Sequence, residues 1–249
     1  MIETLPSLWI VIAAFVAAGF VKGVAGVGLP MTAMGILTFF IDPRTAFALV
    51  FVSIILTNLF QLYRAGDVLA AATRYLPFII CMCIGIPTVL TLTSDAPDRV
   101  LLLSLGFVVL AFVILNLSIE VPELPARHDR TAQIAFGSAA GVLGGLTSLW
   151  LPAIVIFLTA KRTQKEEFIR ATALLLLIGS VPLCVVYIRE GFLTGPLAMM
   201  SAGLLVPTML GLLIGERLRN RLSEKAFRNA TLILFFLVGL NLLRRGILG

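Results

Sequence analysis

Long apolar stretches follow one another along almost the whole chain, and only short polar breaks separate them. Runs of this kind are typical of helices that cross a bilayer, each of which needs about 20 apolar residues. In the first half of the chain they predict helices at residues 5–21, 24–41, 45–63, 73–93 and 99–117. In the second half they predict helices at residues 131–143, 146–159, 168–188, 192–218 and 226–243.

Two helix starts carry recognisable N-terminal signals. Asp42 precedes Pro43, and proline is favoured at the first position of a helix. Thr163 is followed three residues later by Glu166, which is the spacing of a capping box. We therefore expect helices to begin at both places.

The small residues of the first half recur in the second half. Gly19, Gly23, Gly26 and Pro30 return, at a constant offset of 122 residues, as Gly141, Gly145, Ser148 and Pro152. Pro77 and Gly85 return as Pro207 and Gly215, at an offset of 130 residues. The sequence therefore predicts a first transmembrane repeat at residues 1–118, a polar linker at 119–130 and a second transmembrane repeat at 131–249. A Gly-rich broken or re-entrant hairpin is expected to open each repeat of about five helical segments.

Composition and charge add the environment and the orientation. Hydrophobic residues make up 59% of the chain and charged residues 13%, and the mean hydropathy is +1.07, so we expect an all-α polytopic membrane protein. If each hairpin enters and leaves on the same side, 13 basic residues fall on one side of the membrane and 5 on the other, whereas straight crossings give 11 and 7. The positive-inside rule favours the first arrangement. The second repeat is then inverted, the side with 13 basic residues is cytoplasmic, and both termini face the opposite compartment.

Several function classes find no support in the residue pattern. The net charge of +6 is explained by the basic loops and anionic lipid headgroups, so no nucleic-acid partner is expected. The single histidine, His128, lies in the polar linker, and no nucleophile set or metal-ligand spacing is present. Cys81, Cys83 and Cys184 lie in apolar segments and are interpreted as small buried hydrophobes. We therefore expect no enzyme, no catalytic residue, no metal and no cofactor.

The duplicated breaks are the candidate substrate site, because matching interrupted segments in two halves point to the binding site of a secondary transporter. In the first break, Lys22, Gly23, Gly26 and Gly28 place a cation beside glycines that expose backbone N–H groups, followed by the start of a helix. This chemistry suits an anion. The alternatives are that Lys22 snorkels to the interface and that the glycines only permit close helix packing.

The second break is neutral but rich in hydrogen-bond donors. Gly144, Gly145, Thr147 and Ser148 form it, and its hydroxyls either hold anion oxygens or serve helix packing. The two breaks are expected to lie inside the protein, facing one another near the midplane.

Four further polar residues join the candidate site. Asn58 and Gln61, one turn apart, share a helix face and either line the same cavity or bond another helix. Arg64 and Arg74 lie on the expected cytoplasmic side, where they would attract an anion.

The first motif also carries a family resemblance. The run GFVKGVAGVGLP at residues 19–30, followed by Asp42-Pro43, Thr57-Asn58 and Gln61, resembles the sulfite exporter TauE/SafE family of inner-membrane permeases. Leu29 stands where many members carry another glycine. The resemblance implies a duplicated helical permease of the bacterial inner membrane that carries small sulfur-containing anions such as sulfite or organosulfonates. In that membrane the count of basic residues places both termini in the periplasm.

A transport mechanism follows as a hypothesis. The two halves rock about the facing breaks and expose the anion alternately to each side. A passive anion channel and an accessory subunit of a larger complex are the alternatives. The residues do not indicate which sulfur compound is carried, the direction of flux, ion coupling or the oligomeric state.

Overall fold

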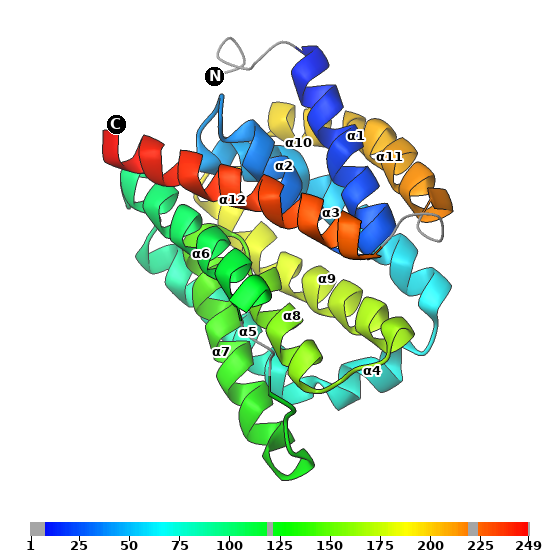
Figure 1. The fold of residues 1–249 in the computed structure, drawn as a ribbon. Helices are drawn as coiled ribbons and strands as arrows, with labels where there is room; N and C mark the ends of the chain where they lie inside the picture. The colour runs from blue at the N-terminus through cyan, green and yellow to red at the C-terminus, as the bar shows by residue number, and fades with distance from the viewer. Residues whose placement is uncertain (1–7, 119–121, 219–223, 249) are drawn as a thin grey trace. The chain divides into compact units, whose positions relative to one another are not determined.

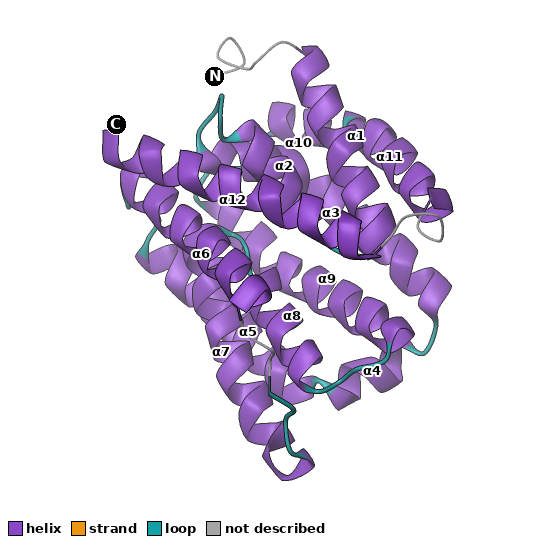
Figure 2. Ribbon diagram, in the orientation of Figure 1, coloured by secondary structure: helices purple, strands orange, loops and turns teal. Residues whose placement is uncertain are grey.

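The computed structural model describes residues 8–118, 122–218 and 224–248, and these residues contain helices and loops but no strand (Figure 2). The helices of the first half are α1 (Leu8–Ala25), α2 (Leu29–Leu37), α3 (Pro43–Ala65), α4 (Val68–Arg74), α5 (Leu76–Leu92) and α6 (Asp98–Ser118). Those of the second half are α7 (Asp129–Thr147), α8 (Leu151–Ala160), α9 (Lys165–Arg189), α10 (Gly195–Gly203), α11 (Leu205–Leu218) and α12 (Glu224–Leu248). A 3₁₀ turn at Ala126–His128 precedes α7. The all-α fold is therefore confirmed.

The helices form two compact units, and each unit draws on both halves of the chain. Unit 1 contains α1, α2, the beginning of α3, α6, α10, α11 and α12. Unit 2 contains the rest of α3, which passes from one unit to the other after Ser53, together with α4, α5, α7, α8 and α9. The hairpin that opens each repeat thus packs with helices of the other repeat.

In unit 1, glycines bring α1 and α11 into close contact along their length (Figure 1). A Cβ on Gly23 would lie 2.9 Å from the Cα of Gly215, and a Cβ on Gly19 would lie 2.9 Å from the carbonyl carbon of Thr208. Backbone contact of this kind is available only to small residues, and it is a common way for helices to associate in membranes.

Unit 2 contains the same kind of packing between α5 and α7. A Cβ on Gly141 would lie 2.8 Å from the Cα of Gly85, and one on Gly137 would lie 2.9 Å from the Cα of Phe78. Gly85 corresponds to Gly215 in the repeat, so equivalent glycines serve equivalent helix contacts in the two units.

Both hairpins are broken a few residues later than predicted. The first break covers residues 26–28 and the second covers residues 148–150, whereas the predictions placed them near residues 22 and 144. Gly23 and Gly145 lie inside helices. Because they have no side chain, another helix can approach the backbone closely at both positions. The helices end where the backbone turns left-handed, at Gly26 with φ +81° and at Ser148 with φ +57°.

One further predicted span matches a single helix and another is divided. The span at 73–93 corresponds to α5, and the short helix α4, which was not predicted, precedes it and meets it at Tyr75 with a bend of 77°. The span at 192–218 is divided into α10 and α11 at Leu204. The remaining predicted spans match α3, α6, α9 and α12 to within a few residues.

One helix-start prediction is confirmed and one is wrong. The Thr45 amide donates a hydrogen bond of 2.8 Å to the Asp42 carboxylate at the start of α3. The capping box at Thr163 does not form, because α9 begins at Lys165 and Gln164 occupies the N-cap without a side-chain bond. The loop before α9 places Thr163 one residue too early to cap the helix.

The helix lengths fit a protein that crosses a membrane several times. Among the described residues, five segments are long and apolar enough to span a bilayer, and the bent pair α4–α5 makes a sixth. The second arms of the hairpins are shorter, since α2 has 9 residues and α8 has 10. At a rise of about 1.5 Å per residue each reaches roughly half of the ~30 Å hydrocarbon core. Neither arm is therefore long enough to cross the hydrocarbon core by itself.

Candidate functional site

The first break, in unit 1, is shaped by two glycines. Gly26 and Gly28 have φ values of +81° and +100°, which strain any residue with a side chain. Gly28 is the N-cap of α2 and provides no side-chain bond to the first turn of that helix. The start of α2 therefore presents backbone N–H groups and the positive end of its dipole at the break.

Lys22 lies in the last turn of α1, directly before this break. Its side chain is 1% exposed, so it is buried and does not extend to the surface as a snorkelling lysine would. An ammonium group is stabilised by the negative end of the helix dipole at this position. A buried lysine remains costly in a membrane protein and usually has a functional reason.

The second break, in unit 2, is shaped by hydroxyl groups. The Ser148 backbone is left-handed, and its Oγ lies 2.8 Å from the hydroxyl oxygen of Tyr187. Thr147 donates a hydrogen bond of 2.7 Å to the Leu143 carbonyl and accepts one of 3.2 Å from the Leu149 amide. Both hydroxyls therefore hold the break in shape. Ser148 occupies the repeat position of Gly26, where a left-handed backbone is also required.

Trp150 and Tyr187 complete the surroundings of the second break. Trp150 is buried, its indole N–H donates a hydrogen bond of 3.4 Å to the Leu175 carbonyl, and its ring lies against Gly179. This agrees with a core-filling role for Trp150. Tyr187 was not identified from the sequence, because it lies 39 residues from Ser148 and no spacing signals the pair.

The two glycines predicted for the second break, Gly144 and Gly145, serve helix packing. A Cβ on Gly144 would lie 2.9 Å from the Ile86 side chain, and one on Gly145 would lie 2.8 Å from the Ile86 carbonyl oxygen. Gly23 has the equivalent packing role in unit 1. These three glycines therefore bring helices together, while Gly26, Gly28 and Ser148 make the turns.

Asn58 and Gln61 lie on a helix whose polar face points inward. On the part of α3 that belongs to unit 2, both side chains are buried, whereas Leu59 and Tyr63 are exposed. This inverted pattern is expected in lipid, where polar residues turn toward protein or a cavity. Their predicted place on one inward face fits the structure.

The two predicted cytoplasmic arginines have different surroundings. The Arg64 guanidinium is exposed and lies over the aromatic ring of Phe60, at 5.5 Å from the ring centre. Arg74 is exposed at the end of α4 and pairs with Glu167 at 3.4 Å. Arg74 therefore belongs to a polar cluster that the sequence did not reveal.

The predicted site residues thus fall into two groups. Unit 1 holds Lys22, Gly23, Gly26 and Gly28, whereas unit 2 holds Asn58, Gln61, Arg64, Arg74, Gly144, Gly145, Thr147 and Ser148. No cluster of three or more potential metal ligands occurs in the described parts of the chain.

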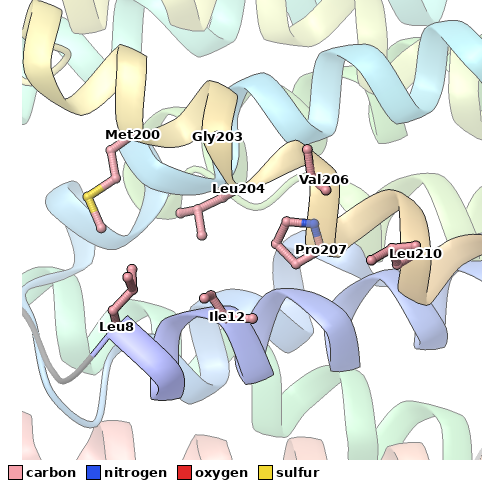
Figure 3. A pocket seen from close by; sticks show the side chains of 8 residues that line it. All are labelled: Leu8, Ile12, Met200, Gly203, Leu204, Val206, Pro207 and Leu210. Atoms are coloured by element: carbon pink, nitrogen blue, oxygen red, sulfur yellow. The ribbon is translucent and has the colours of Figure 1, made fainter.

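An apolar cavity of about 510 Å³ in unit 1 does not suit an anion. It lies between the beginning of α1 and the α10–α11 turn, and its lining carries no charged or hydrogen-bonding side chain (Figure 3). The lining residues are Leu8, Ile12, Met200, Gly203, Leu204, Val206, Pro207 and Leu210.

The helices and the two broken hairpins define a multi-pass helical membrane protein with the architecture expected of a transporter. The family model for the sulfite exporter TauE/SafE matches residues 11–242, and the chain therefore belongs to this family of membrane permeases. No curated protein and no solved structure matches the chain.

Proposed function

We propose that this chain is a secondary transporter that exports small sulfur-containing anions such as sulfite or organosulfonates. The observation that carries the proposal is the buried Lys22 beside a left-handed helix break, in a chain of the TauE/SafE family. A cation and the N-terminus of a helix at one point favour a negatively charged ligand.

The second break complements the first in chemistry. When Tyr187 is the donor in the Ser148–Tyr187 bond, the Ser148 hydroxyl can donate to an oxygen atom of a sulfite or sulfonate group. The Thr147 hydroxyl donates to the Leu143 carbonyl in this structure and would have to turn away from it to bind the anion. Each compact unit carries one broken hairpin. In the proposed mechanism the two repeats rock, and the anion is exposed first to one side of the membrane and then to the other.

Energetics support the outward direction. Moving one negative charge out of an inside-negative cell releases about 2.3 kcal/mol per 100 mV. Export of an anion therefore needs no coupling ion.

Efflux from loaded liposomes tests the proposal with purified protein alone. Wild type should export labelled sulfite or a labelled sulfonate with saturation and trans-stimulation. A passive channel would show neither, and an accessory subunit would be inactive without its complex.

Lys22→Met keeps the length of the side chain and removes its charge. We expect the KM for the anion to rise by at least about tenfold, since charge-assisted hydrogen bonds contribute roughly 1.5–3 kcal/mol. Arg189→Met removes a cation at the far end of α9 and should leave KM unchanged. Unchanged KM and maximal rate in Lys22→Met would exclude Lys22 from the site.

A further inference from the structure

Unit 2 contains a polar cavity of about 430 Å³, and none of its lining residues belongs to either helix break. It forms where the α4–α5 bend, the α8–α9 loop and the first turns of α9 meet. Its lining residues are Arg74, Tyr75, Lys161, Arg162, Thr163, Gln164, Glu166, Glu167 and Arg170. Four of these side chains are cationic and two are anionic. Lys161 also pairs with Asp129 at 2.6 Å, so one positive charge remains in excess.

One carboxylate occupies the centre of the charge network. Glu167 accepts hydrogen bonds from Arg74 at 3.4 Å, from the Tyr75 hydroxyl at 3.1 Å and from Arg170 at 3.3 Å. Oxoanions are commonly bound in the same way, by guanidinium groups and hydroxyls that donate hydrogen bonds to their oxygen atoms. Glu167 therefore shows how an external anion would be held in the cavity.

Two further polar atoms in the lining have no hydrogen-bond partner. The Thr163 Oγ1 and the Arg170 Nε are both buried, and neither is bonded within the described chain. Buried polar atoms are rarely left in this state, and each exception calls for a ligand, a water or another cause. Both atoms are shielded from solvent, so the Thr163 and Arg170 side chains would have to turn toward the cavity before the oxygen atoms of a bound anion could accept these hydrogen bonds.

The α9 helix adds a favourable field at the same place. It is 25 residues long, and its N-cap, Gln164, makes no side-chain bond to the first turn. The positive end of the dipole at its start therefore lies beside the cavity and favours negative charge, part of which Glu166 and Glu167 of the first turn already supply.

We propose that this cavity binds a soluble oxoanion through Arg74, Arg170 and Thr163, with Glu167 as a built-in competitor for the same cations. The inference rests on the proposed function in one respect, since it identifies the anion as the sulfite or sulfonate group that approaches the transporter. The cavity then acts as an anion-collecting site on the face that the charge pattern assigns to the cytoplasm.

Isothermal titration of purified protein in detergent measures the binding directly. The probes are sodium sulfate and sodium methanesulfonate, each compared with sodium chloride at equal ionic strength to remove general screening. Arg170→Gln and Thr163→Val should each weaken binding, by about tenfold for the arginine. Arg189→Gln, at the other end of the same helix, is the matched control and should bind as wild type does. Equal affinity in wild type, Arg170→Gln and Thr163→Val would overturn the assignment.

Glu167 gives a test with the opposite sign. Glu167→Gln removes the competitor and frees Arg74 and Arg170, so sulfate should bind several-fold more tightly. Glu166→Gln removes the same charge from the neighbouring position, where no bond to either arginine is present, and should have a smaller effect. If Glu167→Gln binds sulfate no better than Glu166→Gln, the arginines serve only the ion pairs and the proposal fails.

Two measurements on the wild-type protein, liposome efflux and sulfate titration, separate the two proposals. If the protein binds sulfate through Arg170 but transports no anion, only the proposed transport function is rejected. If it transports the anion but shows no Arg170-dependent binding, only the proposed anion site in the cavity is rejected. A titration with dihexanoyl phosphatidylglycerol tests a lipid headgroup as the source of the anion. Binding of this lipid but not of sulfate or methanesulfonate would overturn the assignment to a soluble anion.

Discussion

The Ser148 hydroxyl and the Tyr187 hydroxyl lie 2.8 Å apart, and both side chains are buried in unit 2. This bond fixes a serine whose backbone is left-handed, at the position where the first repeat carries Gly26. The second break is therefore held by a side-chain contact, whereas the first depends on the freedom of glycine.

The Ser148–Tyr187 bond predicts an order of stabilities. Ser148→Ala loses the bond and keeps the backbone strain, so it should be the less stable variant. Ser148→Gly loses the bond but relieves the strain, which offsets about 1 kcal/mol. Thermal unfolding in detergent should rank wild type first or level with Ser148→Gly, and Ser148→Ala last. A Ser148→Gly variant that unfolds below Ser148→Ala would contradict the strain argument.

Substitutions of the glycines at helix contacts should lower the stability of the protein more than the Ser148 substitutions do. In Gly141→Ala the new methyl group would lie 2.8 Å from the Cα of Gly85, and the helix backbones would have to separate. Overpacking of this kind costs about 1–3 kcal/mol or more. Gly203→Ala is the control, because a Cβ at that position meets nothing within 4 Å. Size-exclusion profiles and melting temperatures should be wild-type-like for Gly203→Ala and degraded for Gly141→Ala.

Most helices were predictable because apolar runs and their breaks carry that information locally. The exact break positions were not. Gly23 and Gly26 look alike in the sequence, yet Gly23 packs against α11 and Gly26 turns the backbone. Only the position of a distant helix separates these two uses of glycine.

For the candidate site, too, local features could be predicted from the sequence but contacts between distant segments could not. The inward face of Asn58 and Gln61 followed from helix periodicity, which is a local property. The partnership of Ser148 with Tyr187 and the three donors around Glu167 depend on contacts between segments far apart in the chain. No spacing pattern in the sequence encodes them.

An ion pair joins the beginning of α7 to the end of α8. The Lys161 ammonium lies 2.6 Å from the Asp129 carboxylate, which also accepts a hydrogen bond of 2.9 Å from Gln133. Both charged side chains are partly exposed, so solvent screening limits the pair to about 1 kcal/mol. A double-mutant cycle with Asp129→Asn and Lys161→Met should give a coupling free energy of unfolding of that size. Additive effects of the two substitutions would show that the pair contributes nothing.

The two tryptophans provide a spectroscopic check on the fold. Trp9 is 79% exposed on α1, where it would face lipid, whereas Trp150 is 2% exposed inside unit 2. Brominated lipids should therefore quench the emission of wild type only in part. In Trp9→Phe the remaining emission comes from Trp150, and neither brominated lipid nor aqueous acrylamide should quench it strongly. Strong quenching of that variant by either agent would show that the second break is open to lipid or water, in contradiction to the enclosed position of Trp150.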